Sequence, residues 1–116
     1  MDSLDLARKI ADVVVDKQGE DILILDLQGL TAFTDYFVIC STTSRRQLDA
    51  IKSATLEEMK KDADISLPKG IEGDGESGWV LVDYNGVILH IFSEEARAYY
   101  QLEELWSAGR VVARIQ

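Results

Sequence analysis

The side chains that could carry acid–base or metal chemistry are few. His90 is the only histidine, and on an alternating strand it would lie diagonal to Asp83 on the same face of a hairpin. Such a pair could move a proton to or from a substrate. No serine or cysteine nucleophile stands beside it in a recognisable motif, and a metal site would need scattered carboxylates to complete it. We therefore expect no catalytic residue, no metal ion and no cofactor, although a small enzyme that acts on a nucleotide or phosphoester through Asp83 and His90 stays open as the alternative.

One glycine-rich stretch has the spacing of a dinucleotide-binding loop. Gly73-Asp-Gly-Glu-Ser-Gly78 matches the pattern G-x-G-x-x-G. That fingerprint needs a strand before it and a helix after it, so that backbone amides and a helix N-terminus meet the phosphates. Here a strand is expected to begin at Trp79, and Asp74 and Glu76 would repel phosphate. The sequence therefore predicts an ordinary loop at this position.

Composition and length are those of one small globular domain. The chain has 116 residues, of which 47% are hydrophobic and 28% charged, with a single proline. No apolar run is long enough to span a membrane, and the N-terminus lacks the pattern of a signal peptide, so we expect a cytoplasmic protein without membrane contact. Cys40 is the only cysteine, which excludes an internal disulfide and a cysteine-based zinc site and favours a packed core thiol.

The charge distribution limits the possible partners. With 21 acids against 12 bases the net charge is −9, which argues against specific binding of nucleic acid. Residues 62–104 hold ten of the acids and only two bases, Lys69 and Arg97. This acidity fits a basic protein partner, but it also fits a plain requirement for solubility, since a net charge well away from zero keeps small domains monomeric. Composition leaves both interpretations open.

Hydrophobic periodicity predicts two helices, two buried strands, a hairpin and a C-terminal helical segment. The helices span residues 3–17 and about 44–63, the strands 21–27 and 35–40, the hairpin 79–92, and the last helix or helix pair 93–106. A loop with Pro68 and several glycines, and at most one short strand, joins the second helix to the hairpin. These elements predict an α/β (α+β) fold with a mixed four- to five-stranded sheet flanked by helices. Residues 1–108 would form the single domain, with residues 109–116 as a C-terminal tail.

The hairpin is the most informative segment, because Asn85-Gly86 between two alternating runs is a strong signal for a two-residue turn. If Tyr84 faces Val87 across the turn, alternation divides the hairpin into two faces. The aliphatic face, which should pack under helices, carries Val80, Val82, Tyr84, Val87, Leu89 and Ile91; the opposite face carries Trp79, Leu81, Asp83, Ile88, His90 and Phe92. Tryptophan beside aspartate and histidine suits a protein interface, although a further helical layer could also cover it.

Three blocks of residues resemble one known family, the ribosomal silencing factor (Iojap-like) family. The first is Asp35-Tyr-Phe-Val-Ile39 with Ser41, Thr43, Ser44, Arg46 and Gln47; the second is Pro68, Glu72-Gly73, Trp79-Val-Leu-Val-Asp-Tyr84 and Gly86-Val-Ile-Leu-His-Ile-Phe92; the third is Arg97, Tyr100, Leu102-Glu103 and Leu105-Trp106. Their order and spacing cover nearly the whole chain, so the combination is specific.

The resemblance implies a sheet similar to nucleotidyltransferase-like folds, without transferase activity, because the residues around Cys40-Ser-Thr-Thr-Ser44 lack the glycine-serine pair and the paired acids of that chemistry. It also implies a monomer or weak homodimer that binds the large ribosomal subunit through its fourteenth L-series protein, blocks joining of the small subunit and represses translation when nutrients are limiting. The partner-contact roles that it implies fall on Trp79, Leu81, Asp83, His90, Tyr100, Glu103 and Trp106.

Overall fold

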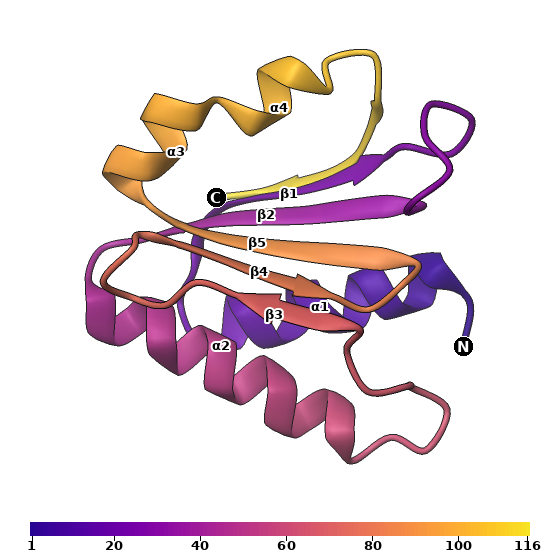
Figure 1. Ribbon diagram of the computed structural model, residues 1–116, viewed down its shortest axis with the longest axis horizontal. Coiled ribbons are helices and arrows are strands. Elements are labelled where there is room, and N and C mark those ends of the chain that lie inside the picture. The colour runs from indigo at the N-terminus through magenta and orange to yellow at the C-terminus, as the bar shows by residue number, and fades with distance from the viewer.

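The computed structural model describes residues 1–116 as one six-stranded sheet between two unequal helical layers (Figure 1). The strands are β1 (Glu20–Asp26), β2 (Tyr36–Thr42), β3 (Gly70–Glu72), β4 (Trp79–Asp83), β5 (Val87–Ser93) and β6 (Arg110–Ile115). Their order in the sheet is β3-β4-β5-β2-β1-β6, in which β2 and β5 pair in parallel and all other neighbours pair antiparallel. The long helices α1 (Ser3–Asp16) and α2 (Arg45–Lys60) lie on one face, and the short helices α3 (Glu94–Tyr100) and α4 (Leu102–Leu105) lie on the other (Figure 1). This confirms the predicted mixed sheet flanked by helices.

Each of the two long helices begins next to a residue whose side chain caps it. In α1 (Ser3–Asp16) the carboxylate of Asp2 accepts a hydrogen bond from the amide of Asp5. In α2 (Arg45–Lys60) the hydroxyl of Ser44 accepts from the amide of Gln47, and the Gln47 side chain accepts in return from the amide of Thr43. This arrangement closely resembles a capping box, and it fixes where the chain turns from strand into helix.

The bounds of the central strands agree with the sequence prediction to within one or two residues. Every residue of β2 is buried, because this strand lies between β5 and β1 and is covered on both faces. Cys40 in β2 is fully buried, and burial raises the pKa of its thiol to about 12, so the prediction of a packed core thiol is confirmed.

The C-terminal segment differs from the prediction of a tail. Arg110–Ile115 form β6, which pairs with β1 and raises the strand count to six. Its register shifts between Ile24 and Leu25 of β1, and no residue of β6 is buried. An edge strand of this kind shows no clean alternation of apolar and polar residues. Its formation depends on pairing with a strand that lies more than eighty residues earlier.

Two separate cores follow from the two faces of the sheet. The larger one lies under α1 and α2 and contains the aliphatic face of the hairpin, from Val80 to Ile91. The smaller one lies under α3 (Glu94–Tyr100) and α4 (Leu102–Leu105) and is centred on Phe37, Phe92 and Leu102. The chain passes from α3 to α4 through Gln101, which has a left-handed backbone with φ of 48°. Because α3 and α4 are short, the second face of the sheet is only partly covered. No helix in the structure has the length and apolar character that crossing a membrane requires.

Candidate partner-binding surface

The hairpin has the register that the sequence predicts. Trp79 pairs with Phe92, Leu81 with His90 and Asp83 with Ile88. The amide of Tyr84 donates to the carbonyl of Val87 over 2.8 Å, which closes the two-residue turn, and Asn85 adopts a positive φ of 78°. Four of the predicted contact residues, Trp79, Leu81, Asp83 and His90, therefore lie on the sheet face that α3 and α4 cover in part.

His90 lies beneath Trp79 and does not reach the surface. The residue is only 3% exposed, and its Nδ1 accepts a hydrogen bond of 3.2 Å from the indole Nε1 of Trp79. The Phe37 ring packs edge-on against the imidazole at a centroid distance of 4.5 Å. Burial lowers the pKa of His90 to about 3, so the ring is neutral at physiological pH. The predicted contact role of His90 is therefore best understood as support for the indole of Trp79.

Asp83 and His90 do not form the acid–base pair of the alternative enzyme hypothesis. No hydrogen bond or ion pair joins their side chains, and the carboxylate of Asp83 instead accepts from the amide of Asn85 at 2.8 Å. The remaining imidazole nitrogen of His90, Nε2, is buried without a partner. A general base must reach the proton that it removes, and this imidazole is enclosed by Trp79, Phe37 and Phe92. No group of three or more potential metal-ligating side chains gathers anywhere in the structure.

The glycine-rich loop has the wrong context for a nucleotide site. It leads into β4 and is fastened to α2 by a hydrogen bond from the Gly75 amide to the carboxylate of Asp49. The hollow that it helps to line, of about 600 Å³, carries the three acids Glu76, Glu94 and Glu95 and the single base Arg45. Phosphate would meet net negative charge there, as the sequence predicts.

Aromatic side chains form a continuous cluster above the sheet. Trp79 stacks on Phe92 at a centroid distance of 4.9 Å and contacts the Tyr100 ring at 4.6 Å. Trp106 packs edge-on against Phe37 at 5.7 Å. Its other side faces Phe33, at 5.8 Å. Helices α3 and α4 thus bring Tyr100 and Trp106 onto the same face as Trp79.

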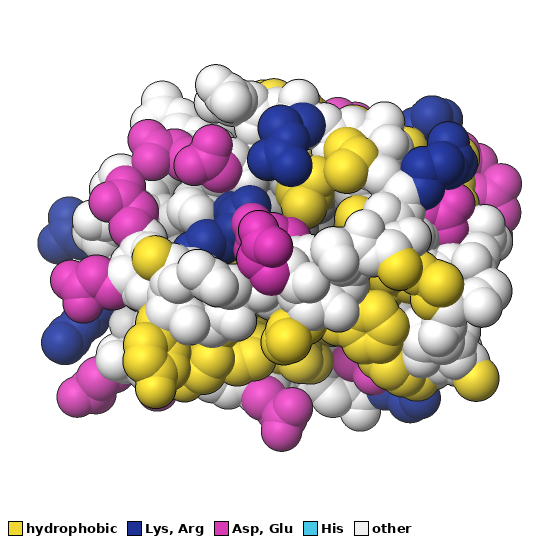
Figure 2. Space-filling view, turned by 90° about the horizontal axis from the view of Figure 1, so that it is seen from above, with side chains coloured by type: hydrophobic (Ala, Val, Ile, Leu, Met, Phe, Trp, Pro, Cys, Tyr) yellow, Lys and Arg dark blue, Asp and Glu magenta, His cyan; other side chains and the backbone are white.

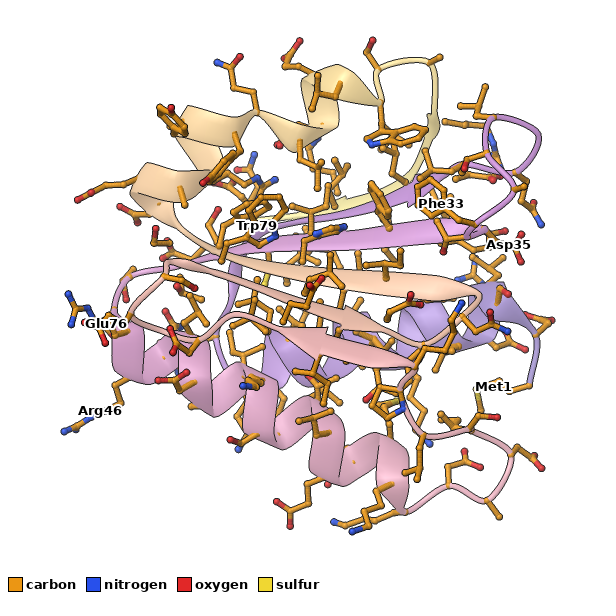
Figure 3. All side chains as sticks on the ribbon, viewed as in Figure 1. Met1, Phe33, Asp35, Arg46, Glu76 and Trp79 are labelled. Atoms are coloured by element: carbon orange, nitrogen blue, oxygen red, sulfur yellow. The ribbon has the colours of Figure 1, made fainter.

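We define the aromatic surface as five residues of this region that are at least partly exposed, namely the aromatic residues Phe33, Trp79, Tyr100 and Trp106 together with Leu81. Figure 3 places Trp79 beneath α3 and Phe33 near the loop between β1 and β2, both on the same side of the sheet. Phe33 and Tyr100 are 51% and 46% exposed. In the space-filling view of this side, hydrophobic side chains form a band along one margin of the face (Figure 2). Exposed aromatic groups of this kind are common in protein interfaces.

Phe33 is the residue that sequence reasoning missed. It is a single aromatic residue in the irregular segment between β1 and β2, so neither strand alternation nor helical periodicity marks it. Its position becomes evident only from its contacts with Phe37 and Trp106, which lie 4 and 73 residues away.

Acidic side chains lie beside the aromatic surface at the edge of the sheet. In the antiparallel pair of β3 and β4, Glu72 pairs with Leu81 and Gly70 with Asp83. Paired residues point to the same face, so Glu72 joins Leu81 and Asp83 on the face of Trp79. Glu72 is exposed and Asp83 is partly exposed, and neither forms an ion pair. This edge therefore presents negative charge that is free to meet a cationic partner.

Glu103, in contrast, is engaged inside the molecule. Its carboxylate accepts a 2.9 Å hydrogen bond from Nε of Arg97, whose side chain is 11% exposed. The Nη1 group of Arg97 donates to the carbonyl of Asp21 and to the hydroxyl of Ser41. Arg97 thus joins α3 and α4 to the ends of β1 and β2. The predicted contact residue Glu103 holds the two short helices in place through Arg97.

Comparison with known proteins identifies the relatives of the chain. The model of the family described as "Ribosomal silencing factor during starvation" matches residues 1–116. Ribosomal silencing factor RsfS of Bacillus subtilis (strain 168) is 44% identical over 93 residues, which cover 78% of this chain and 75% of that protein. Ribosomal silencing factor RsfS of Halalkalibacterium halodurans is 34% identical over 112 residues, or 97% and 94%. A crystal structure of a Chromobacterium violaceum protein superposes with a TM-score of 0.86 and 28% identity, covering 100% of this chain and 94% of that one.

Proposed function

Because the chain belongs to the ribosomal silencing factor family, we propose that it acts in the cytoplasm by binding the large ribosomal subunit through its fourteenth L-series protein. Bound there, it would keep the small subunit from joining and so repress translation when nutrients are limiting. The proposal assigns no catalytic reaction, cofactor or metal ion to the chain. The general role in this proposal, regulation of the ribosome, is the one that the family description states.

The observation that carries the proposed contact is the aromatic surface with its acidic edge. Trp79, Tyr100 and Trp106 offer rigid apolar area at little cost in side-chain entropy. Glu72 and Asp83 lie beside them without cationic partners of their own. Many ribosomal proteins are basic because they contact RNA, and such a partner complements an acidic rim. We propose Trp79 as the central anchor, with His90 fixing its orientation from below.

The test is a subunit-joining assay read on sucrose gradients. Wild-type protein in excess over subunits should shift joined ribosomes toward free subunits and should sediment with the large subunit. Trp79→Ala should weaken this effect, because truncating an interface tryptophan commonly costs about 2–4 kcal/mol, or roughly 30- to 1000-fold in affinity. Each variant must first be shown to be folded by circular dichroism and thermal unfolding.

Two outcomes would distinguish a failure of the silencing role from a failure of the proposed binding surface. If the wild type leaves joined ribosomes intact, the silencing role is wrong for this chain. If the wild type splits them and Trp79→Ala does so equally well, the role stands and the chosen surface fails. A charge reversal beside the aromatic surface, Asp83→Lys, tests the acidic residues, and Glu57→Lys is its matched control, since Glu57 is exposed on α2 behind the opposite face of the sheet.

A further inference from the structure

The segment that joins β5 to β6 covers the second face of the sheet but buries very little of itself (Figure 1). We call residues 94–109, which contain α3 and α4, the strap. Leu102 is its only buried residue, whereas α1 buries five residues and α2 buries four. Helices as short as α3 and α4 do not persist in water by themselves, so packing must hold them in place. The strap is therefore held by fewer buried side chains than the long helices are.

The backbone of the strap is joined to the sheet only at its two ends. None of its residues belongs to a strand pair, and α3 begins directly after Ser93, whose hydroxyl accepts from the Ala96 amide. Its turn bonds, such as the one from the Gly109 amide to the Trp106 carbonyl, stay within the segment. The strap can therefore leave the sheet without breaking a backbone hydrogen bond of any strand pair.

Arg97 supplies the side-chain hydrogen bonds that fasten the strap to the sheet. Its Nη1 donates to the carbonyl of Asp21 over 2.8 Å and to the hydroxyl of Ser41 over 2.9 Å. Asp21 has a positive φ of 46° at an irregularity in the pairing of β1 with β2, which leaves its carbonyl available to Arg97. The Nε atom of the same guanidinium pairs with Glu103 of α4. One side chain thus connects both short helices to two strands.

The strap carries two of the residues that define the aromatic surface, Tyr100 and Trp106. We infer that the strap opens and closes as one unit, with Arg97 as its latch, while the rest of the fold stays intact. Opening takes both rings out of the aromatic surface and uncovers Phe37 and Phe92, against which they pack. The fraction of closed molecules then sets the apparent affinity of this surface for its partner. That consequence rests on the proposed function, whereas the opening itself does not.

Native-state hydrogen exchange of the ¹⁵N-labelled full chain, at urea concentrations below the unfolding transition, measures the opening amide by amide. Amides of α3 and α4 should exchange through an opening that costs less free energy than global unfolding and depends little on urea, since it exposes little surface. The slowest amides of α1 and α2 should follow global unfolding. Strap amides that exchange with the same free energy and the same urea dependence as those of α1 and α2 would overturn the inference.

Two variants distinguish the latch from general stability. Ile10→Val trims a fully buried side chain of α1 that stays packed when the strap opens, so it should speed the slowest amides roughly 2- to 10-fold and leave strap exchange unchanged. Arg97→Met should speed strap exchange roughly 5- to 100-fold. If Ile10→Val accelerates the strap as much as the slowest amides, the strap opens only with the whole fold. If Arg97→Met leaves strap exchange unchanged, Arg97 is not the latch.

Binding to large ribosomal subunits tests the consequence for function. The double variant Arg97→Met/Leu102→Ala removes the latch and the only buried side chain of the strap, so its apparent Kd should rise about tenfold or more. Ile10→Val should bind as the wild type does, although its global stability is lower. Wild-type affinity in a double variant that exchange shows to be open would overturn the link to binding. A wild type that does not bind large subunits would refute the proposed function, and this regulation with it, while the opening measured by exchange would stand.

Discussion

The indole of Trp79 donates its N–H to Nδ1 of His90 across 3.2 Å, and this contact fixes the state of both residues. Because Nδ1 accepts, the proton of the neutral imidazole lies on Nε2. A protonated imidazole would have to give up the acceptor that holds the indole. The orientation of the proposed anchor Trp79 therefore depends on a histidine that stays neutral, and burial keeps it so.

Folding stability should fall between pH 7 and pH 5 because of His90. Its folded-state pKa, about 3, lies below the unfolded value of about 6.5, so the unfolded chain binds a proton first as the pH drops. The contribution of His90 to the free energy of unfolding is present above pH 6.5 and is lost progressively as the pH falls toward 3. From pH 6.5 to 5 the loss should be about 1.5 kcal/mol, because the slope rises from half its limit at pH 6.5 toward about 1.4 kcal/mol per pH unit.

Urea unfolding at a series of pH values measures this effect. His90 is the only histidine, so His90→Gln, which can still accept from the indole through its amide oxygen, should show a nearly flat profile over the same range. An equally steep profile in His90→Gln would mean that another group is responsible.

Arg97→Met should destabilise the fold by about 1–3 kcal/mol. The change removes the ion pair with Glu103 and the hydrogen bonds to Asp21 and Ser41, and it leaves the Glu103 carboxylate partly buried with no cation. Glu103→Gln in the Arg97→Met background should restore part of the loss. A double-mutant cycle by urea unfolding checks this, and strictly additive effects would show that the pair does not couple.

Gly73→Ala should cost more than about 2 kcal/mol. Gly73 has a φ of +85°, and a Cβ atom there would lie 1.9 Å from the carbonyl oxygen of Trp79, so the loop would have to move at the start of β4. Gly70→Ala is the matched control, because open space surrounds that position and its stability should stay within about 1 kcal/mol of the wild type. Thermal unfolding compares the two, and equal losses would contradict the steric argument.

Local signals explain why the sequence predicts the hairpin so well. The Asn85-Gly86 turn and strict alternation determine its register, so the pairs Trp79–Phe92 and Leu81–His90 follow from neighbouring residues alone. The capping residues Ser44 and Ser93 likewise mark helix starts through side chains only three positions away from the amides that they accept from.

Contacts between distant segments explain what the sequence left out. The burial of His90 depends on Phe37 of β2, and the position of Phe33 depends on Trp106. The pairing of Glu103 with Arg97 required the left-handed turn at Gln101, which no residue pattern marks. The strand at residues 110–115 forms only because β1 offers a free edge. These long-range contacts determine which of the predicted residues reach solvent. Hydrophobic periodicity and motif spacing describe only neighbouring residues, so they do not contain that information.

The two acids that the sequence grouped as contacts should respond differently to charge reversal. Asp83→Lys should leave the free energy of unfolding within about 1 kcal/mol of the wild-type value, because Asp83 is partly exposed at the end of β4 and accepts only a turn amide. It should slow association with the large subunit, and this effect should shrink as salt screens the charges. Glu103→Lys should instead destabilise the fold, since it places a cation against Arg97. Glu57→Lys, with the same change in net charge on α2, should alter neither quantity. Association rates at low and high salt and urea unfolding of all three variants decide the matter; an Asp83→Lys effect that Glu57→Lys reproduces would show that overall charge, and not this edge, governs binding.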